Sequence, residues 1–161
     1  MTAVNTEDKS LKEILEKAKT VAMIGVSSSE KEEVSTSIKR RPSVIVMKYL
    51  QDFGYKVIPV NPFSVGKKIN GEIIVGNLSD IDVPIDIVNV FRPSKEAAGL
   101  AEQAVKNEAK TLWLQFGIES KEAQKIANSA NIYYVANRCI KQEYQRLFLK
   151  VNPVFPALLN N

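Results

Sequence analysis

The amino-acid sequence predicts an α/β fold in which a doubly wound, mostly parallel sheet lies between two layers of helices, giving three layers in all. Short apolar runs typical of buried strands alternate along the chain with segments of helical periodicity, and this alternation predicts parallel strands joined by right-handed crossovers. A chain of 161 residues, 45% apolar and 25% charged, also has the size and composition of one globular domain.

The first third of the chain predicts two helices and two central strands. Residues 6–19 place apolar side chains at helical spacing behind an acidic first turn, which predicts a leading amphipathic helix. Residues 21–26 form a continuous apolar run, as expected of a strand covered on both faces. Residues 30–41 show no clear period and predict a long loop. A helix at 43–53 and a second strand at 56–60 follow.

The rest of the chain repeats this alternation. After a turn at Asn70-Gly71, residues 72–75 predict a third strand at an edge of the sheet. Three further strands are each followed by a helix: the strands at residues 86–91, 111–116 and 132–136, and the helices at residues 95–107, 121–130 and 140–148. We expect a leading helix within residues 1–20, a main domain at 21–150 and a Pro-interrupted tail at 151–161.

Composition excludes several classes of function. No apolar stretch approaches the roughly 20 residues that cross a bilayer, and the charged N-terminal segment is not typical of a signal peptide, so we expect a cytoplasmic protein without a membrane partner. The net charge of +4, with one dense cluster at residues 39–41, is too small to indicate nucleic-acid binding but suits a small polyanion. The single cysteine, Cys139, excludes an internal disulfide.

The chain contains no histidine. This absence excludes Ser-His-Asp and Cys-His catalysis, histidine-containing zinc sites and histidine acid-base steps. Any catalysis would have to use other side chains.

The candidate site lies where the strands end. In doubly wound sheets, ligands bind outside the carboxyl ends of the strands, near the point where the strand order reverses. Polar, glycine or proline residues follow each apolar run directly, and the exits are residues 25–29, 61–62, 91–93, 115–117 and 137–139. Gly25 and the serines after it predict a turn whose backbone N–H groups could bind phosphate.

Two common nucleotide motifs are absent. A strand followed by G-x-G-x-x-G, with an acidic residue ending the second strand, would indicate NAD, but Gly25 stands alone and the second strand ends in Asn61-Pro62. The spacing of the ATP- and GTP-binding P-loop is also missing. Without a carboxylate at the second exit, nothing there would repel a ligand phosphate.

Five segments, in this order, resemble a known family. They are Gly-Val-Ser at 25–27, YKVIPVNP at 55–62, VFR at 90–92, WLQFG at 113–117 and NRCIKQE at 137–143. This series resembles the small stand-alone CoA-binding proteins, which are similar to the CoA-binding domain of the succinyl-CoA synthetase alpha subunit. The resemblance covers residues 21–147 and implies a Rossmann-like sheet that binds coenzyme A.

The resemblance also implies the positions that contact coenzyme A. The turn at Gly25, Val26, Ser27 and Ser28 would meet the pyrophosphate, and Asn61 and Pro62 would border the adenosine. Lys67 or Lys68 is the candidate for the ribose 3′-phosphate, with Arg41, close to Ser43, as a second basic contact. Phe91, Arg92 and Pro93 would form another wall. Gln115 and Gly117 would line the side toward the pantetheine arm, and the last exit contributes Asn137, Arg138 and Cys139.

Cys139 is a further hypothesis. It follows Arg138 at a strand exit and precedes a predicted helix, a setting that favours the reactive thiolate. The residue could therefore approach the thiol of coenzyme A and form a mixed disulfide under oxidation. The loop between the Gly-Val-Ser turn and Arg41 is longer than is usual in the family, and Asn137 stands where Asp is common.

Each candidate also has a purely structural alternative. A free cysteine is most often a small buried apolar residue, and Trp113 is better suited to the core than to stacking on a ligand. Arg92 could pair with a surface carboxylate, Gln115 could bond only to neighbouring backbone, and the lysines at 67 and 68 could be solvated loop charges.

The sequence favours a protein that binds coenzyme A or an acyl-CoA and catalyses no reaction of its own. The synthetase that the chain resembles needs a phosphorylatable histidine, so we do not expect ligase activity from this chain alone. An NAD(P)-dependent oxidoreductase and a non-catalytic interaction subunit remain as alternatives. The sequence leaves open the identity of the acyl group, the pathway, and whether the protein is a monomer or a small homo-oligomer.

Overall fold

The computed structural model describes residues 7–26 and 42–150. The predicted loop at 30–41 and the predicted tail at 151–161 lie outside these ranges, as do the candidate site residues Ser27, Ser28 and Arg41.

A five-stranded parallel sheet forms the centre of the molecule, which confirms the predicted α/β, Rossmann-like fold. Its strands lie in the order β2-β1-β5-β6-β7, and every neighbouring pair is parallel. Their bounds are β1 Thr20–Ile24, β2 Lys56–Val60, β5 Ile87–Val90, β6 Thr111–Leu114 and β7 Tyr133–Val135. β1 and β5 are buried along their whole length, as expected of strands covered on both faces.

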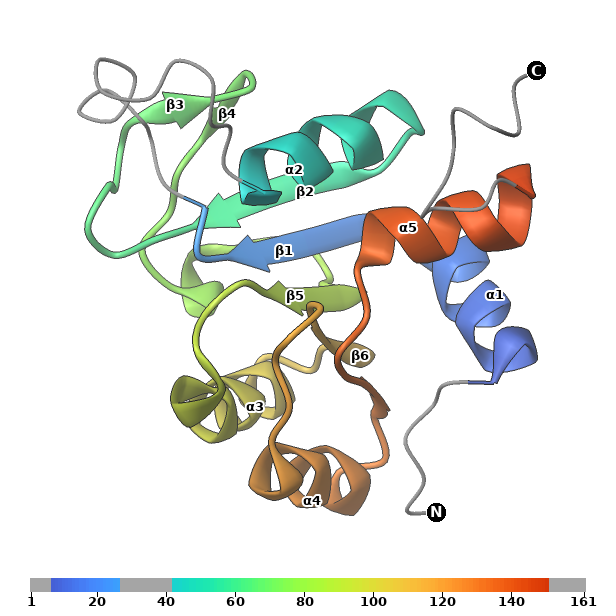
Figure 1. Cartoon of the computed structure of the whole chain (residues 1–161). Helices are drawn as coiled ribbons and strands as arrows, with labels where there is room; N and C mark the ends of the chain where they lie inside the picture. The colour runs from blue at the N-terminus through green and yellow to red at the C-terminus, as the bar shows by residue number, and fades with distance from the viewer. Residues whose placement is uncertain (1–6, 27–41, 151–161) are drawn as a thin grey trace.

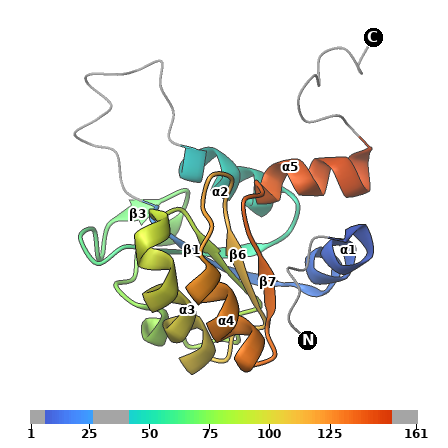
Figure 2. The same ribbon diagram turned by 60° about the horizontal axis from the view of Figure 1, so that its bottom comes forward.

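Helices cover both faces of the sheet (Figures 1 and 2). One face packs against α1 Asp8–Lys17, α2 Pro42–Asp52 and α5 Ile140–Tyr144, which continues as a π-helical segment, Gln145–Leu149. The other face packs against α3 Ala97–Lys106 and α4 Lys121–Ser129. Alternate residues of each strand enter opposite cores: Met23 and Trp113 belong to the first, and Ala22 and Leu112 to the second.

Helix α3 presents a face of small residues to the sheet. Ala97, Ala101 and Ala104 are fully buried against the sheet and against α4. The short 3-10 helices Leu78–Asp80 and Ser94–Glu96 complete the described elements. No helix in residues 7–26 or 42–150 has the length and apolar character needed to cross a membrane.

The strand predicted at residues 72–75 takes a different position. Glu72–Ile73 (β4) pairs antiparallel with Lys68–Ile69 (β3) in a separate two-stranded sheet, and only Val75 reaches the main sheet, through a bridge to Val60. The reason is the turn between β3 and β4: Asn70 and Gly71 both have positive φ, 49° and 81°. Such a turn reverses the chain at once into a hairpin.

The strand order places a switch point between β1 and β5. From β1 the chain crosses to β2 on one side, and it then returns to β5 on the other side. Connections that leave in opposite directions open a crevice at the carboxyl ends of the two strands.

Candidate functional site

Gly25 directly follows β1 at the switch point, where any other residue would be strained. Its φ is +104°, and its N–H donates to the carbonyl of Val60 at 3.1 Å. A Cβ at this position would lie 3.0 Å from the carbonyl oxygen of Phe91 and 3.2 Å from Cδ of Arg92. The backbone that follows β5 can therefore pack directly against the backbone that follows β1, because Gly25 has no side chain.

A hollow of about 180 Å³ opens beside Gly25, and we call it the switch-point hollow. Its wall combines the exits of β1, β2 and β5 with one side of α3. The lining residues are Ile24, Gly25, Val60, Asn61, Pro62, Phe63, Gly76, Asn77, Arg92, Glu96, Leu100 and Gln103.

Asn61 shapes the β2 side of this hollow. Its Nδ2 donates to the carbonyl of Val26 at 3.0 Å, which ties the exit of β2 to that of β1. Its Oδ1 accepts from the N–H of Phe63 at 2.8 Å, a bond that fixes the turn after the strand. Phe63 is consequently held on the rim of the hollow with 91% of its surface exposed.

Arg92 lines the same hollow but already has a partner. Its Nε and Nη2 donate to the two carboxylate oxygens of Glu96 at 3.1 and 2.8 Å. The hydrogen bond from Arg92 lowers the pKa of Glu96 below its usual value. Arg92 thus makes the surface ion pair that was the alternative to ligand binding, and its contact with a ligand stays a prediction.

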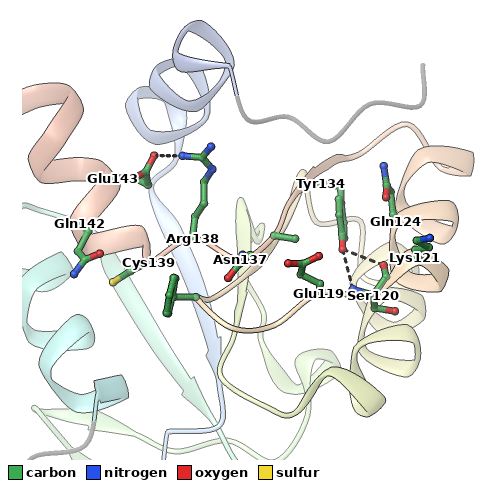
Figure 3. A pocket seen from close by; sticks show the side chains of 12 residues that line it. Glu119, Ser120, Lys121, Gln124, Tyr134, Asn137, Arg138, Cys139, Gln142 and Glu143 are labelled. Atoms are coloured by element: carbon green, nitrogen blue, oxygen red, sulfur yellow. Dashed lines mark hydrogen bonds and ion pairs between the residues drawn. The ribbon is translucent and has the colours of Figure 1, made fainter. Parts of the chain in front are cut away.

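A larger hollow of about 610 Å³ lies at the carboxyl ends of β6 and β7, between α4 and α5. We call it the α4–α5 hollow. Figure 3 shows side chains from both helices and from the two strand exits around it. They belong to Phe116, Glu119, Ser120, Lys121, Gln124, Tyr134, Ala136, Asn137, Arg138, Cys139, Gln142 and Glu143.

Asn137 ties together the loops on the sheet side of the α4–α5 hollow. Its Oδ1 accepts from the N–H of Gly117 at 2.7 Å, and its own N–H donates to the carbonyl of Ile118 at 3.0 Å. The position has φ +59°, which asparagine tolerates better than most residues. Aspartate, which is common at this position in the family that the sequence resembles, would accept the same hydrogen bond from Gly117. Asn137 therefore holds the two loops together without a carboxylate.

Gln115 lies beneath the loops and outside both hollows. It is buried, and its Oε1 accepts from Nδ2 of Asn89 at 3.1 Å and from the N–H of Ile140 at 2.9 Å. Gln115 therefore links β5, β6 and the first residue of α5, through one side-chain partner and one backbone partner distant in sequence, and its contact with a ligand stays a prediction. Trp113 is also a core residue, with its Nε1 donating to the carbonyl of Arg138 at 2.8 Å.

Cys139 lines the α4–α5 hollow and is half-buried, directly before α5. Its carbonyl accepts from the N–H of Glu143 at 2.9 Å. Arg138, next to it, donates from Nη1 to Oε1 of Glu143 at 3.0 Å.

The remaining described site candidates line neither hollow. Phe91 is half-buried directly after β5 and packs against the first core, Pro93 is exposed after β5, and Ser43 is buried in the first turn of α2. Lys67 and Lys68 are exposed on the β3–β4 hairpin, beyond the exit of β2. Gly117 is exposed after β6 and has open space where a Cβ would stand.

The family model for the CoA binding domain matches residues 19–145, a range that contains the whole sheet. The chain belongs to the CoA binding domain family. It is also 36% identical over 137 residues to a Bacillus subtilis (strain 168) protein described as the uncharacterized protein YneT, covering 85% of this chain and 93% of that one.

Solved structures are also similar to this CoA binding domain in both sequence and fold. A Thermus thermophilus protein is 36% identical, with a TM-score of 0.77 over 89% of this chain and 100% of that one. A hypothetical protein from Pyrococcus horikoshii OT3 is 35% identical, with a TM-score of 0.77 over 91% of this chain and 97% of that one. These comparisons confirm the resemblance seen in the five sequence segments.

Several lining residues of the CoA binding domain were not predicted from the sequence. Phe63 directly follows the predicted exit at 61–62, and Phe116 lies within the exit at 115–117 but was not singled out. Further examples lie on helices: Leu100 and Gln103 on α3, Lys121 and Gln124 on α4, and Gln142 on α5. The local sequence of a helix does not indicate which strand exit the helix will lie beside in the fold. In the described part of the chain, no cluster of acidic or cysteine side chains could hold a metal ion.

Proposed function

We propose that the protein binds coenzyme A, free or as a thioester, along the carboxyl edge of the sheet, and that it catalyses no reaction of its own. Membership of the CoA binding domain family supports coenzyme A binding in general. The observation that carries the finer proposal is the presence of two hollows on one edge, the switch-point hollow and the α4–α5 hollow. Five strands about 4.8 Å apart make that edge about 19 Å wide, which suits an elongated ligand.

The nucleotide end belongs at the switch-point hollow. The apolar atoms of Ile24, Val60 and Leu100 and the exposed ring of Phe63 offer a surface for a flat base. The pyrophosphate is placed at the turn after Gly25 and at the first turn of α2, since the first N–H groups of a helix lack partners within the helix and attract anions.

The ribose 3′-phosphate is assigned to the lysines of the β3–β4 hairpin. Lys67 and Lys68 are exposed and follow the exit of β2, at the same end of the sheet as the switch-point hollow (Figure 1). Coenzyme A lacking the 3′-phosphate should then bind more weakly than coenzyme A. The difference should shrink in a Lys67→Gln, Lys68→Gln double variant, as measured by calorimetry.

The thiol end is assigned to the α4–α5 hollow, beside Cys139. Under oxidation, the Cys139 thiolate attacks one sulfur of the disulfide form of coenzyme A. A protein–CoA disulfide forms, and one equivalent of coenzyme A leaves as the thiolate. Mass spectrometry after incubation with CoA disulfide should show one CoA-sized adduct that a reductant removes, and no adduct on Cys139→Ser. If wild-type protein gains no adduct, the exchange step is wrong.

Thermal unfolding tests the proposed function directly. A ligand that binds only the folded protein stabilises it, by about 2.7 kcal/mol at a concentration 100 times its Kd. Coenzyme A should therefore raise the unfolding midpoint, whereas NAD and ATP at the same concentration should change it little. A rise with NAD alone would favour the oxidoreductase alternative, and no rise with millimolar coenzyme A would overturn the proposal.

A further inference from the structure

We propose that the α4–α5 hollow receives the acyl group of a CoA thioester and that Arg138 selects acyl groups ending in a carboxylate. This inference rests on the proposed function, because it takes the thiol end of coenzyme A to lie beside Cys139. The ligands it names are monothioesters of dicarboxylic acids.

The size and chemistry of the hollow favour a polar acyl group. Its volume of about 610 Å³ is more than three times the 180 Å³ of the switch-point hollow, so it has room beyond the thiol. Hydroxyl, amide and charged side chains make up most of its wall (Figure 3). A plain alkyl chain would take these groups out of water without replacing their hydrogen bonds, at a cost in free energy.

The bonding of Arg138 leaves it able to bind a second carboxylate. Within the described residues, its guanidinium makes one hydrogen bond, from Nη1 to Oε1 of Glu143, although a guanidinium carries five N–H donors. The Arg138 side chain is 34% exposed and lines the hollow. Arginine is also the side chain whose forked donors match a carboxylate.

Glu143 does not neutralise Arg138 fully, because it is shared. Its Oε1 also accepts from Nη2 of Arg146 at 2.8 Å, so two guanidinium groups meet one carboxylate. Arg146 is balanced by Asp8, to which it donates at 3.1 and 2.9 Å. The cluster thus holds two guanidinium groups and two carboxylates, and Arg138 and Glu143 are the members that line the hollow, where Arg138 still has N–H donors without a partner among the described residues.

The position of Arg138 suits a short acyl chain. Arg138 and Cys139 are adjacent, with Cα atoms about 3.8 Å apart, and both line the α4–α5 hollow. A thioester sulfur beside Cys139 would place a carboxylate a few bonds away within reach of the long Arg138 side chain. Lys121, on α4, is the second basic residue of the wall, which also carries the carboxylates of Glu119 and Glu143. A ligand carboxylate is therefore expected to bind through the free donors of Arg138 and not through a net positive charge.

The test compares pairs of thioesters that have equal numbers of carbons and differ in a terminal carboxylate. Calorimetry gives the Kd of malonyl- and propionyl-CoA, and of glutaryl- and valeryl-CoA. For wild type, the carboxylate-bearing member of at least one pair should bind tenfold or more tightly than its partner. In Arg138→Gln this ratio should fall to about one, and any change in affinity for coenzyme A itself cancels in the ratio.

Two variants serve as controls. Lys141→Gln removes one positive charge from α5 outside the hollow, where Nζ lies 5.5 Å from the ring centroid of Tyr49, so its ratio should equal that of wild type. Arg138→Lys keeps the charge without the fork and should give an intermediate ratio. Glu143 keeps Arg146 as a partner in both Arg138 variants, so they should fold.

Binding of coenzyme A without preference within either pair would overturn this inference and leave the proposed function standing. A preference that persists in Arg138→Gln would do the same. If no thioester and no coenzyme A binds wild-type protein, the proposed function fails, and this inference fails with it.

Discussion

Gly25 and Phe91 are in contact at the switch point: a Cβ on Gly25 would lie 3.0 Å from the Phe91 carbonyl oxygen. The N–H of Phe91 also donates to the carbonyl of Ile24 at 2.8 Å, so the exits of β1 and β5 are hydrogen-bonded directly before the glycine. Because a side chain at position 25 would meet the Phe91 backbone, the backbone of Gly25 itself lines the switch-point hollow.

Gly25→Ala should destabilise the protein by about 1–3 kcal/mol, because alanine is strained at φ +104° and its methyl group meets the backbone of Phe91. Coenzyme A should also bind at least tenfold more weakly, since the displaced backbone forms part of the site. Urea unfolding and calorimetry measure the two effects. Gly99→Ala is the control: this exposed glycine lies in α3 with open space around it, so the change should stabilise by up to about 1 kcal/mol. Equal stability of Gly25→Ala and wild type would contradict the account.

Phe63→Ala should weaken coenzyme A binding with little effect on folding. A 91% exposed ring adds little to stability, so the free energy of unfolding should change by less than about 0.5 kcal/mol. Loss of stacking on the base should cost about 1–3 kcal/mol of binding, roughly a 5- to 150-fold rise in Kd. Ile73→Ala removes another exposed apolar side chain, on β4 outside the hollow, and should leave the Kd unchanged. Unaltered affinity in Phe63→Ala would place the base elsewhere.

Gln115→Leu should destabilise the fold by about 2–4 kcal/mol, because its Oε1 accepts from both Asn89 and Ile140 in the interior. Gln115→Leu leaves Nδ2 of Asn89 without its acceptor on Gln115. Adding Asn89→Leu removes this donor as well. The double variant should therefore be more stable, by about 1 kcal/mol or more, than the sum of the single changes predicts. Chemical denaturation of the four proteins gives this coupling, and additivity within about 0.3 kcal/mol would show that the two side chains act independently.

Tyr55 should make stability sensitive to alkaline pH. Burial raises the pKa of its hydroxyl, which donates to the carbonyl of Leu15. The folded state therefore favours the protonated form, and this stabilisation is complete below the unfolded pKa of about 10 and is lost as pH rises above it. Tyr55→Phe should be less stable than wild type by about 1 kcal/mol at pH 7, and the gap should narrow above pH 10. A gap that stays constant from pH 7 to 11 in urea unfolding would rule this out.

The sequence predicted the central sheet and the edge that carries the candidate site. Apolar runs such as Val57–Val60 are dictated by burial on both faces, and parallel strands bring their exits to one edge whatever their order. The Arg92–Glu96 pair also had a local signal, since residues four apart meet on a helix-like turn.

Other features depended on tertiary packing. Residues 72–75 have the apolar character of a strand, but the Asn70-Gly71 turn pairs Glu72–Ile73 with the preceding segment, leaving only Val75 to meet Val60. The burial of Gln115 under α5, with its hydrogen bond from the N–H of Ile140, has no mark in the local sequence, and its predicted contact with a ligand stays a prediction. The α4–α5 hollow likewise exists only once α4 and α5 are packed on the sheet.

The most direct test maps coenzyme A onto the backbone by NMR. The account predicts that adding coenzyme A shifts the amide resonances of Gly25, Phe63, Gly117 and Cys139, which follow the carboxyl ends of four different strands. Ala18, Lys110 and Thr111 line a separate hollow of about 150 Å³ at the amino ends of the strands, and their amides should not move. Shifts confined to that opposite edge, or no shifts at millimolar coenzyme A, would contradict the central claim.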